Sequence, residues 1–188
     1  VITYNRNGTL SFSKNATIDV MRAAKALYGT PTGRTQLRRM DQSDIKVKLS
    51  ISPESKTGRT VDGKLTQIYG KAVQGNFNES DNYARKVNSD GTYGITEASI
   101  IIYEGTIKGQ LEQGQGKHQG LTLEQAIGAV VAHEGVHATD KSEIHKDIKE
   151  EMTKYQVRED REVKPNAVER QIMKEYKILN KSRWWIDF

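Results

Sequence analysis

Two histidines and a glutamate stand in a spacing that is typical of metal-dependent hydrolases. The stretch Ala132–Asp140 contains His133, Glu134 and His137, which form the pattern His-Glu-x-x-His. Residues four apart lie one helical turn from each other, so both imidazoles point to the same side and can bind one zinc ion. Glu134 then faces the water molecule on that ion and can take its proton. Because the pattern is expected by chance only about 0.01 times in such a chain, we interpret it as a metal site rather than as core histidines bonded to the backbone.

A third protein ligand has to come from another element, because a catalytic zinc ion usually has three protein ligands and one open position. His145 lies eight residues beyond His137, and a third histidine six residues beyond His137 is excluded because that position is Glu143. Acidic residues further along the chain are the remaining candidates, although surface charge would explain most of them: Glu159, Asp160, Glu162, Glu169 and Glu175.

Asp140 is the candidate for a supporting residue. It follows His137 by three residues and His133 by seven, which places it on their side of the helix. A carboxylate there can accept a hydrogen bond from a ligand imidazole and fix its tautomer. The alternative is an ordinary charge near the end of the helix.

The elements that must position these residues follow from the hydrophobic pattern. Thr122 and Gln125 form a capping box, which predicts a helix to about Thr139; it is apolar nearly all round and is therefore buried. Ile45–Ser52 alternates apolar and polar residues like a half-buried strand, and the β-branched run Ser99–Tyr103 predicts a strand buried on both faces. Further predictions are an N-terminal helix over 16–28, a long mobile loop over 105–120, a helix from near Pro165 and a docked apolar tail over 184–188.

Length and composition narrow the class of protein. The 188 residues suit one domain, taken as 1–188, and the absence of cysteine excludes disulfides and thiolate zinc sites. A mean hydropathy of -0.72 and the lack of a long apolar run exclude a membrane span. The net charge of +5 raises the alternative of a nucleic-acid-binding module, but the densest charged stretch, Lys141 to Glu162, mixes both signs. A start at Val-Ile-Thr-Tyr, without Met, suggests the C-terminal fragment of a longer chain.

A second motif, taken with the first, carries a family resemblance. Glu162-Val-Lys-Pro-Asn-Ala-Val-Glu169 follows the form Glu-x-x-(Ala/Pro)-x-x-x-Glu, and Leu27–Leu37 contains Thr-x-x-Gly-Arg. With His-Glu-x-x-His-Ala, these stretches resemble the zincin metallopeptidase domains of bacterial effectors and polymorphic toxins, such as the tips of Rhs-repeat proteins. Only the first motif is specific.

The resemblance implies a fold, an activity and a set of residue roles. It implies an α+β zincin-like fold with N-terminal helices, a small twisted and mainly antiparallel sheet, the buried motif helix and a C-terminal helical part. It also implies Zn²⁺ bound by His133, His137 and Glu162, with Glu134 as the general base of peptide hydrolysis. One departure, Glu169-Arg170 where similar domains have Glu-Asn, leaves Glu159 and Glu169 as alternatives to Glu162.

The implied partners are a protein or peptide substrate and a cognate immunity or inhibitor protein, for a domain that is secreted or delivered into a target cell. An extended substrate could pair as an added strand with Ser99–Tyr103 or with its neighbour. Two other classes stay open at this point: a basic nucleic-acid-binding module, and an inactive zinc-binding interaction domain.

Overall fold

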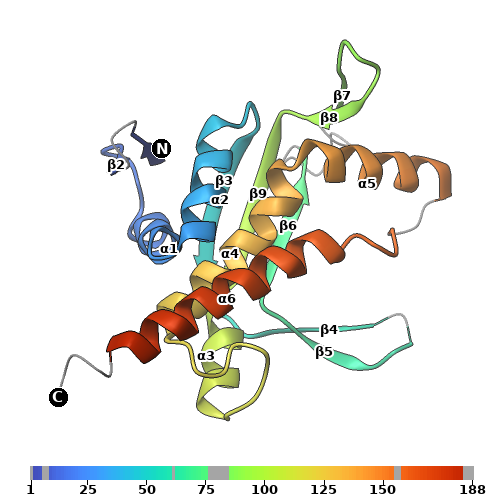
Figure 1. Cartoon of the computed structure of the whole chain (residues 1–188). Coiled ribbons are helices and arrows are strands. Elements are labelled where there is room, and N and C mark those ends of the chain that lie inside the picture. Colours follow the sequence, from blue (N-terminus) through green and yellow to red (C-terminus); the bar gives the residue numbers. More distant parts are fainter. Residues whose placement is uncertain (1, 6–8, 61, 76–84, 155–157, 184–188) are drawn as a thin grey trace.

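The structure is a computed structural model that describes residues 2–5, 9–60, 62–75, 85–154 and 158–183 (Figure 1). Its elements in chain order are β1 (Ile2–Tyr4), β2 (Leu10–Phe12), α1 (Ile18–Tyr28), α2 (Pro31–Gln42), β3 (Lys46–Ser52), β4 (Lys56–Arg59), β5 (Leu65–Ile68), β6 (Gly70–Gln74), β7 (Arg85–Val87), β8 (Tyr93–Ile95), β9 (Glu97–Tyr103), α3 (Glu104–Glu112), α4 (Leu123–Thr139), α5 (Lys141–Lys154) and α6 (Val163–Arg183). The chain is therefore of the α+β class.

The central sheet has the order β3-β9-β6. β9 pairs in parallel with β3 and antiparallel with β6, and Ile100 and Ile102 on it are fully buried, so the strand predicted from the β-branched run is confirmed as the centre of the sheet. The other described pairings, β1–β2, β4–β5 and β7–β8, are antiparallel hairpins. Antiparallel pairing predominates as expected, but the sheet that supports the core is mixed rather than purely antiparallel.

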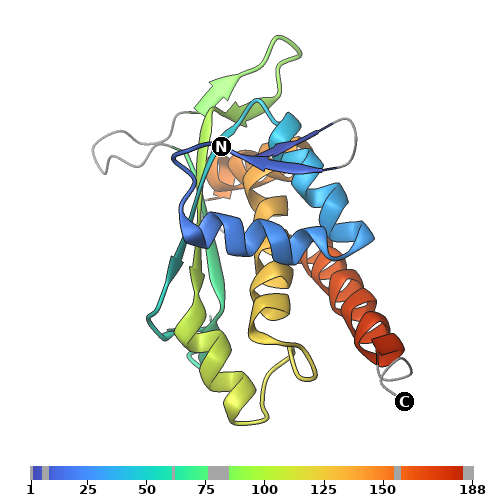
Figure 2. The same cartoon turned by 90° about the vertical axis from the view of Figure 1, so that its left-hand side faces the viewer.

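The helix α4 passes through the middle of the molecule (Figure 2). It packs against β6 and β9 of the sheet, and α1, α2 and α6 also pack against it. Every residue from Ala126 to Ala138 is buried, and the capping box of Thr122 and Gln125 is formed in both directions. The predicted buried helix is confirmed, because burial on all sides satisfies its apolar circumference.

The turn between α1 and α2 explains the Thr-x-x-Gly-Arg stretch. The side chain of Thr30 caps α2 by accepting a hydrogen bond from the N–H of Gly33 at 3.0 Å. A Cβ at Gly33 would lie 1.9 Å from the carbonyl oxygen of Leu27, so only glycine fits there. Arg34 donates to the carbonyl of Tyr28 at 3.0 Å, which also satisfies the end of α1.

The mobile loop predicted over 105–120 is wrong for its first half, which forms α3. Ile107 on this helix is fully buried, and Glu104 at its start forms an ion pair with Arg22 of α1 at 2.8 Å. These contacts come from distant parts of the chain and outweigh the low helix propensity of the glycines. The predicted docking of the tail over 184–188 lies outside the described residues. No described helix is long and apolar enough to cross a bilayer.

Candidate metal centre

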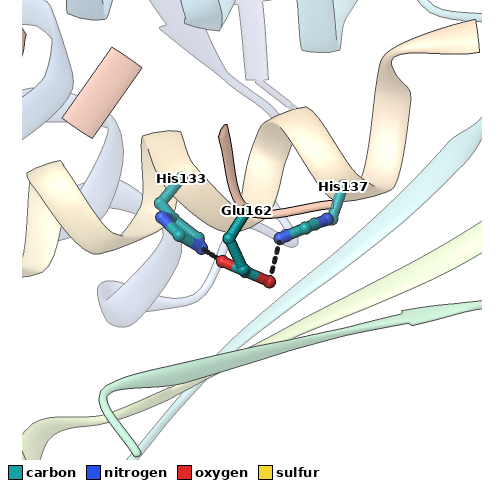
Figure 3. A group of neighbouring side chains, drawn as sticks. All are labelled: His133, His137 and Glu162. Atoms are coloured by element: carbon teal, nitrogen blue, oxygen red, sulfur yellow. Dashed lines mark ion pairs between the residues drawn. The ribbon is translucent and has the colours of Figure 1, made fainter. Parts of the chain in front are cut away.

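His133, His137 and Glu162 come together beside α4 (Figure 3). The two carboxylate oxygens of Glu162 lie 3.0 Å from Nε2 of His133 and 3.2 Å from Nε2 of His137. One donor atom from each residue lies within 4.8 Å of the others, so the group could hold a metal ion. The structure thus brings together the three residues expected as ligands, although they are up to 29 positions apart in the sequence.

The helix α4 fixes the two histidines relative to each other. They are one turn apart, and their ring centroids are separated by 5.2 Å with an angle of 60° between the planes. Both residues are buried, since His133 is 8% and His137 3% exposed. Because α4 is held on all sides, the rings have little freedom to turn away.

Glu162 is positioned by the turn that precedes α6. Its carbonyl accepts a hydrogen bond from the N–H of Asn166 at 3.0 Å, which starts the helix directly after it. The same turn carries Arg158, whose guanidinium contacts Glu143 and lies 3.3 Å from a carboxylate oxygen of Asp147. Arg161 also pairs with Asp147, at 3.2 Å. The arginines therefore tie the turn to α5, and Glu162 is left to face the histidines.

Gln74 connects Asp147, the carboxylate that pairs with both arginines, to the end of α4. The side-chain amide of Gln74, on β6, donates to the backbone carbonyl of His137 at 2.8 Å and to Asp147 at 3.0 Å. One residue thus joins the sheet, the end of α4 and the middle of α5. Nothing in the local sequence around Gln74 marks it for this role.

Glu169, an alternative for the third ligand, reaches the site from behind. It is 1% exposed, and one oxygen lies 3.1 Å from Nδ1 of His133, the ring nitrogen opposite to the one that faces Glu162. It therefore supports a ligand instead of joining the three donors. The other alternative, Glu159, is exposed to solvent.

The supporting role expected for Asp140 is not what the structure describes. Its carboxylate accepts a hydrogen bond from the N–H of Glu143 at 3.1 Å and contacts Lys164. Asp140 therefore ends α4, begins α5 and ties α6 to both. The spacing argument failed because the chain leaves the helix at Asp140, so its side chain no longer follows the helical face of His133 and His137.

Glu134 lies against the sheet on the other side of the histidines. It is 7% exposed, and its carboxylate accepts a hydrogen bond from the backbone N–H of Ala72 on β6. Burial raises the pKa of Glu134, and the charges of His133 and His137 oppose this only in part. The group is thus an acidic side chain whose neutral form is stabilised, as a proton-transferring group requires.

The electrostatics of the three donors reflect their mutual hydrogen bonds. Burial alone would lower the pKa of His133, but its hydrogen bonds with Glu162 and Glu169 outweigh that effect and raise the pKa to about 9. Hydrogen bonds with the two histidines hold the pKa of Glu162 far below its usual range. A cation is therefore favoured between these groups, either as a proton on His133 or as a metal ion.

The site opens into a cleft of about 540 Å³ between β5, β6, α4 and the start of α6. The expected pairing of a substrate with Ser99–Tyr103 itself is wrong, because β9 lies between β3 and β6 and has no free edge. Its neighbour β6 is the edge strand at the cleft. The main-chain groups of Tyr69 and Gly75 form hydrogen bonds with Tyr103 and Glu97 of β9. Because hydrogen-bonded and non-hydrogen-bonded residues alternate along an antiparallel pair, the N–H and C=O groups of Gly70 and Ala72 point away from β9.

Several residues that complete the site have no recognisable signal in the sequence: Gln74, Lys117, His118, Arg158 and Arg161. Comparison of the chain with protein-family models, with curated proteins and with solved structures finds no match.

Proposed function

We propose that this chain is a zinc-dependent metalloendopeptidase domain of the zincin kind. The observation that carries the proposal is the convergence of two imidazole nitrogens and a carboxylate oxygen at a cleft, with the buried carboxyl group of Glu134 beside them. Two histidines and one glutamate are a known ligand set of catalytic zinc, which leaves one position open.

The spacing of the donors is compatible with a small tetrahedral ion after a small rearrangement. Ligands about 2.0–2.2 Å from such an ion lie about 3.3–3.6 Å from one another. One oxygen of Glu162 lies 3.0 Å from Nε2 of His133 and the other lies 3.2 Å from Nε2 of His137, and one donor atom of each residue lies within 4.8 Å of the others. Glu162 has room to adjust to the ion, because its side chain is 56% exposed.

Bound there, zinc would polarise a scissile carbonyl and lower the pKa of a water molecule. The remaining chemistry falls to Glu134, which would take the proton of the attacking water and return it to the leaving amine. Its raised pKa suits both steps, because the acid form then persists closer to neutral pH.

An extended peptide is the substrate that the cleft accommodates best. The outward main-chain groups of Gly70 and the carbonyl of Ala72 can pair with it as an added strand. Such pairing uses backbone groups, so it would orient many sequences alike across the histidines. The class of substrate is thus a protein segment in extended conformation.

The proposal extends to a toxin or effector domain that is secreted or delivered into a target cell and is neutralised by an immunity protein. Its support is the resemblance of the His-Glu-x-x-His motif and of Glu162–Glu169 to the motifs of effector domains. Both glutamates of the second motif contact His133 of the first. Expression in the compartment that holds the target should arrest growth only when Glu134 is intact. Equal toxicity of the Glu134→Gln form would mean that proteolysis is not the lesion.

The enzymatic proposal is tested with Glu134→Gln and with the matched control Glu159→Gln, which alters an exposed glutamate. Glu134→Gln should keep zinc and lose about 10²- to 10⁴-fold in turnover of an unstructured protein substrate, because an acid–base group is removed and no ligand is. The control should behave like the parent. Full turnover by Glu134→Gln, or a parent that binds no zinc, would refute the proposal.

A further inference from the structure

A buried network extends from the metal centre into the loop between α3 and α4. Glu169 accepts hydrogen bonds through both carboxylate oxygens: Oε2 lies 3.1 Å from Nδ1 of His133, and Oε1 lies 2.7 Å from Nε2 of His118. Lys117 also donates to Oε2, at 2.7 Å. Glu169 and His118 are 1% and 2% exposed, so the network is shielded from solvent.

The hydrogen-bond directions in this network determine the tautomer of His133. An ionised carboxylate only accepts, so Nδ1 of His133 must donate to Glu169. A neutral ring then has its lone pair on Nε2, which is the atom that faces Glu162. Glu169 therefore holds His133 in the tautomer that a metal ligand needs.

The two ligand histidines differ in this respect. Nδ1 of His137 is buried and has no hydrogen-bond partner within the described ranges, whereas Nδ1 of His133 has Glu169. The support of the site is thus concentrated on one ring. A substitution of Glu169 therefore changes the support of His133 and leaves the surroundings of Nδ1 of His137 as they are.

His118 is the residue that fixes Glu169 from the loop side. Its ring packs edge-on against Tyr69, with centroids 4.9 Å apart, and its neighbour Lys117 lies over the same tyrosine and lines the cleft. An apolar pair of similar volume would fill this space without burying charge, so packing alone does not account for a histidine and a glutamate here. The burial of both points to the ligand they hold.

We propose that His118 is a positioning residue of the metal centre, acting through Glu169 on His133. The inference rests on the proposed function, and it gives the loop over 113–122 a role in that function. His118 touches neither the three donors nor the space between them in any described contact. Its effect should therefore appear in the affinity and geometry of the bound metal before it appears in turnover.

The test compares Glu169→Gln and His118→Phe with His145→Phe. His118→Phe keeps the ring against Tyr69 and loses the hydrogen bond to Glu169. His145→Phe is the matched control, because that ring stacks on Tyr93 and accepts a hydrogen bond from its N–H, away from the site. Thermal unfolding of the metal-free proteins establishes that each variant is folded.

Zinc affinity is measured by competition with a chelator, and the ligand field by the visible spectrum of the cobalt-substituted protein. Glu169→Gln should bind zinc about 10- to 100-fold more weakly. His118→Phe should weaken binding in the same direction and shift the cobalt spectrum, and His145→Phe should match the parent in both.

Folded Glu169→Gln and His118→Phe proteins with the parent's affinity and spectrum would overturn the inference while leaving the proposed function intact. A parent that binds neither zinc nor cobalt would overturn both. The loss of zinc by His137→Ala identifies the site at which binding is measured.

Discussion

Replacing Gly70 by alanine tests whether the sheet positions Glu134, the proposed general base. β6 passes so close to α4 at this point that an added Cβ would lie 2.8 Å from Cγ1 of Val130 and 2.9 Å from both Cγ and Oε1 of Glu134. Ordinary contacts begin at 3.4 Å, so the neighbours must give way by about 0.6 Å. Val130 is β-branched on a buried helix and cannot swing aside.

The clash should displace Glu134 and weaken its hydrogen bond with Ala72. Overpacking of this kind costs about 1–3 kcal/mol in unfolding free energy. Misplacement of a reacting group by about 1 Å can cost about 10²-fold in rate, so we expect kcat to fall by about 10- to 100-fold. Zinc affinity should stay near that of the parent, because the added Cβ meets none of the three donors among its nearest neighbours.

The measurements are kcat and KM on a peptide substrate, zinc affinity and denaturant unfolding. Gly109→Ala is the matched control: Gly109 lies in α3 with nothing within 4 Å of its added Cβ, so stability should hold or rise by up to about 1 kcal/mol. A Gly70→Ala protein with the kcat and stability of the parent would show that the approach of β6 does not position Glu134.

Three other perturbations probe the ligands and their anchor. Glu162→Ala should weaken zinc binding by orders of magnitude and Glu159→Ala should not; equal affinities would move the third ligand elsewhere. Arg158→Ala removes one partner from each of two buried carboxylates of α5, of which Glu143 keeps Lys146 and Asp147 keeps Arg161. It should cost about 1–3 kcal/mol in denaturant unfolding; a cost below about 0.5 kcal/mol would refute its role as the anchor. In the metal-free protein the pKa of His133, raised from 6.5 to about 9, contributes stability that is complete below pH 6.5 and is lost as the pH rises through 9. The lowered pKa of Glu162 contributes stability present above pH 4.5 and lost on acidification. Zinc affinity should therefore rise with pH toward about 9, since the ring must release its proton to bind; pH-independent affinity between pH 6 and 9 would contradict this.

The parts of the site that were predictable from sequence are those that a single helix creates. The capping box at Thr122 and the repeat of His133 and His137 depend on residues three or four apart, and such local contacts leave a periodic trace in the sequence. The prediction of Glu162 as the third ligand, ahead of Glu159 and Glu169, depends on a resemblance between motifs, because no periodicity in the sequence connects Glu162 to α4.

The supporting contacts were missed for the opposite reason. His118 and Glu169 are 51 residues apart, and Gln74 and Asp147 are 73 apart. Each of these residues looks like ordinary polar surface in its own segment, and its burial depends on how distant elements pack. The glycines around His118 pointed to a mobile loop, whereas positive φ angles at Gly114, Gly116 and Gly120 are what let the chain turn tightly there.

The contact between α4 and α6 sets the geometry of the whole centre, because α6 and the turn directly before it bring two residues to one ring. Glu162 and Glu169 are seven positions apart, two turns of a helix, and they contact opposite nitrogens of His133. A displacement of α6 against α4 would therefore disturb the contacts on both sides of this ring. Further along the same two helices, a Cβ at Gly128 would lie 3.2 Å from the hydroxyl of Tyr176, which itself donates to the carbonyl of Ala26 on α1. This close packing limits how far α6 can tilt. Gly128 and Tyr176, which lie away from the three donors, therefore help to hold Glu162 and Glu169 against His133.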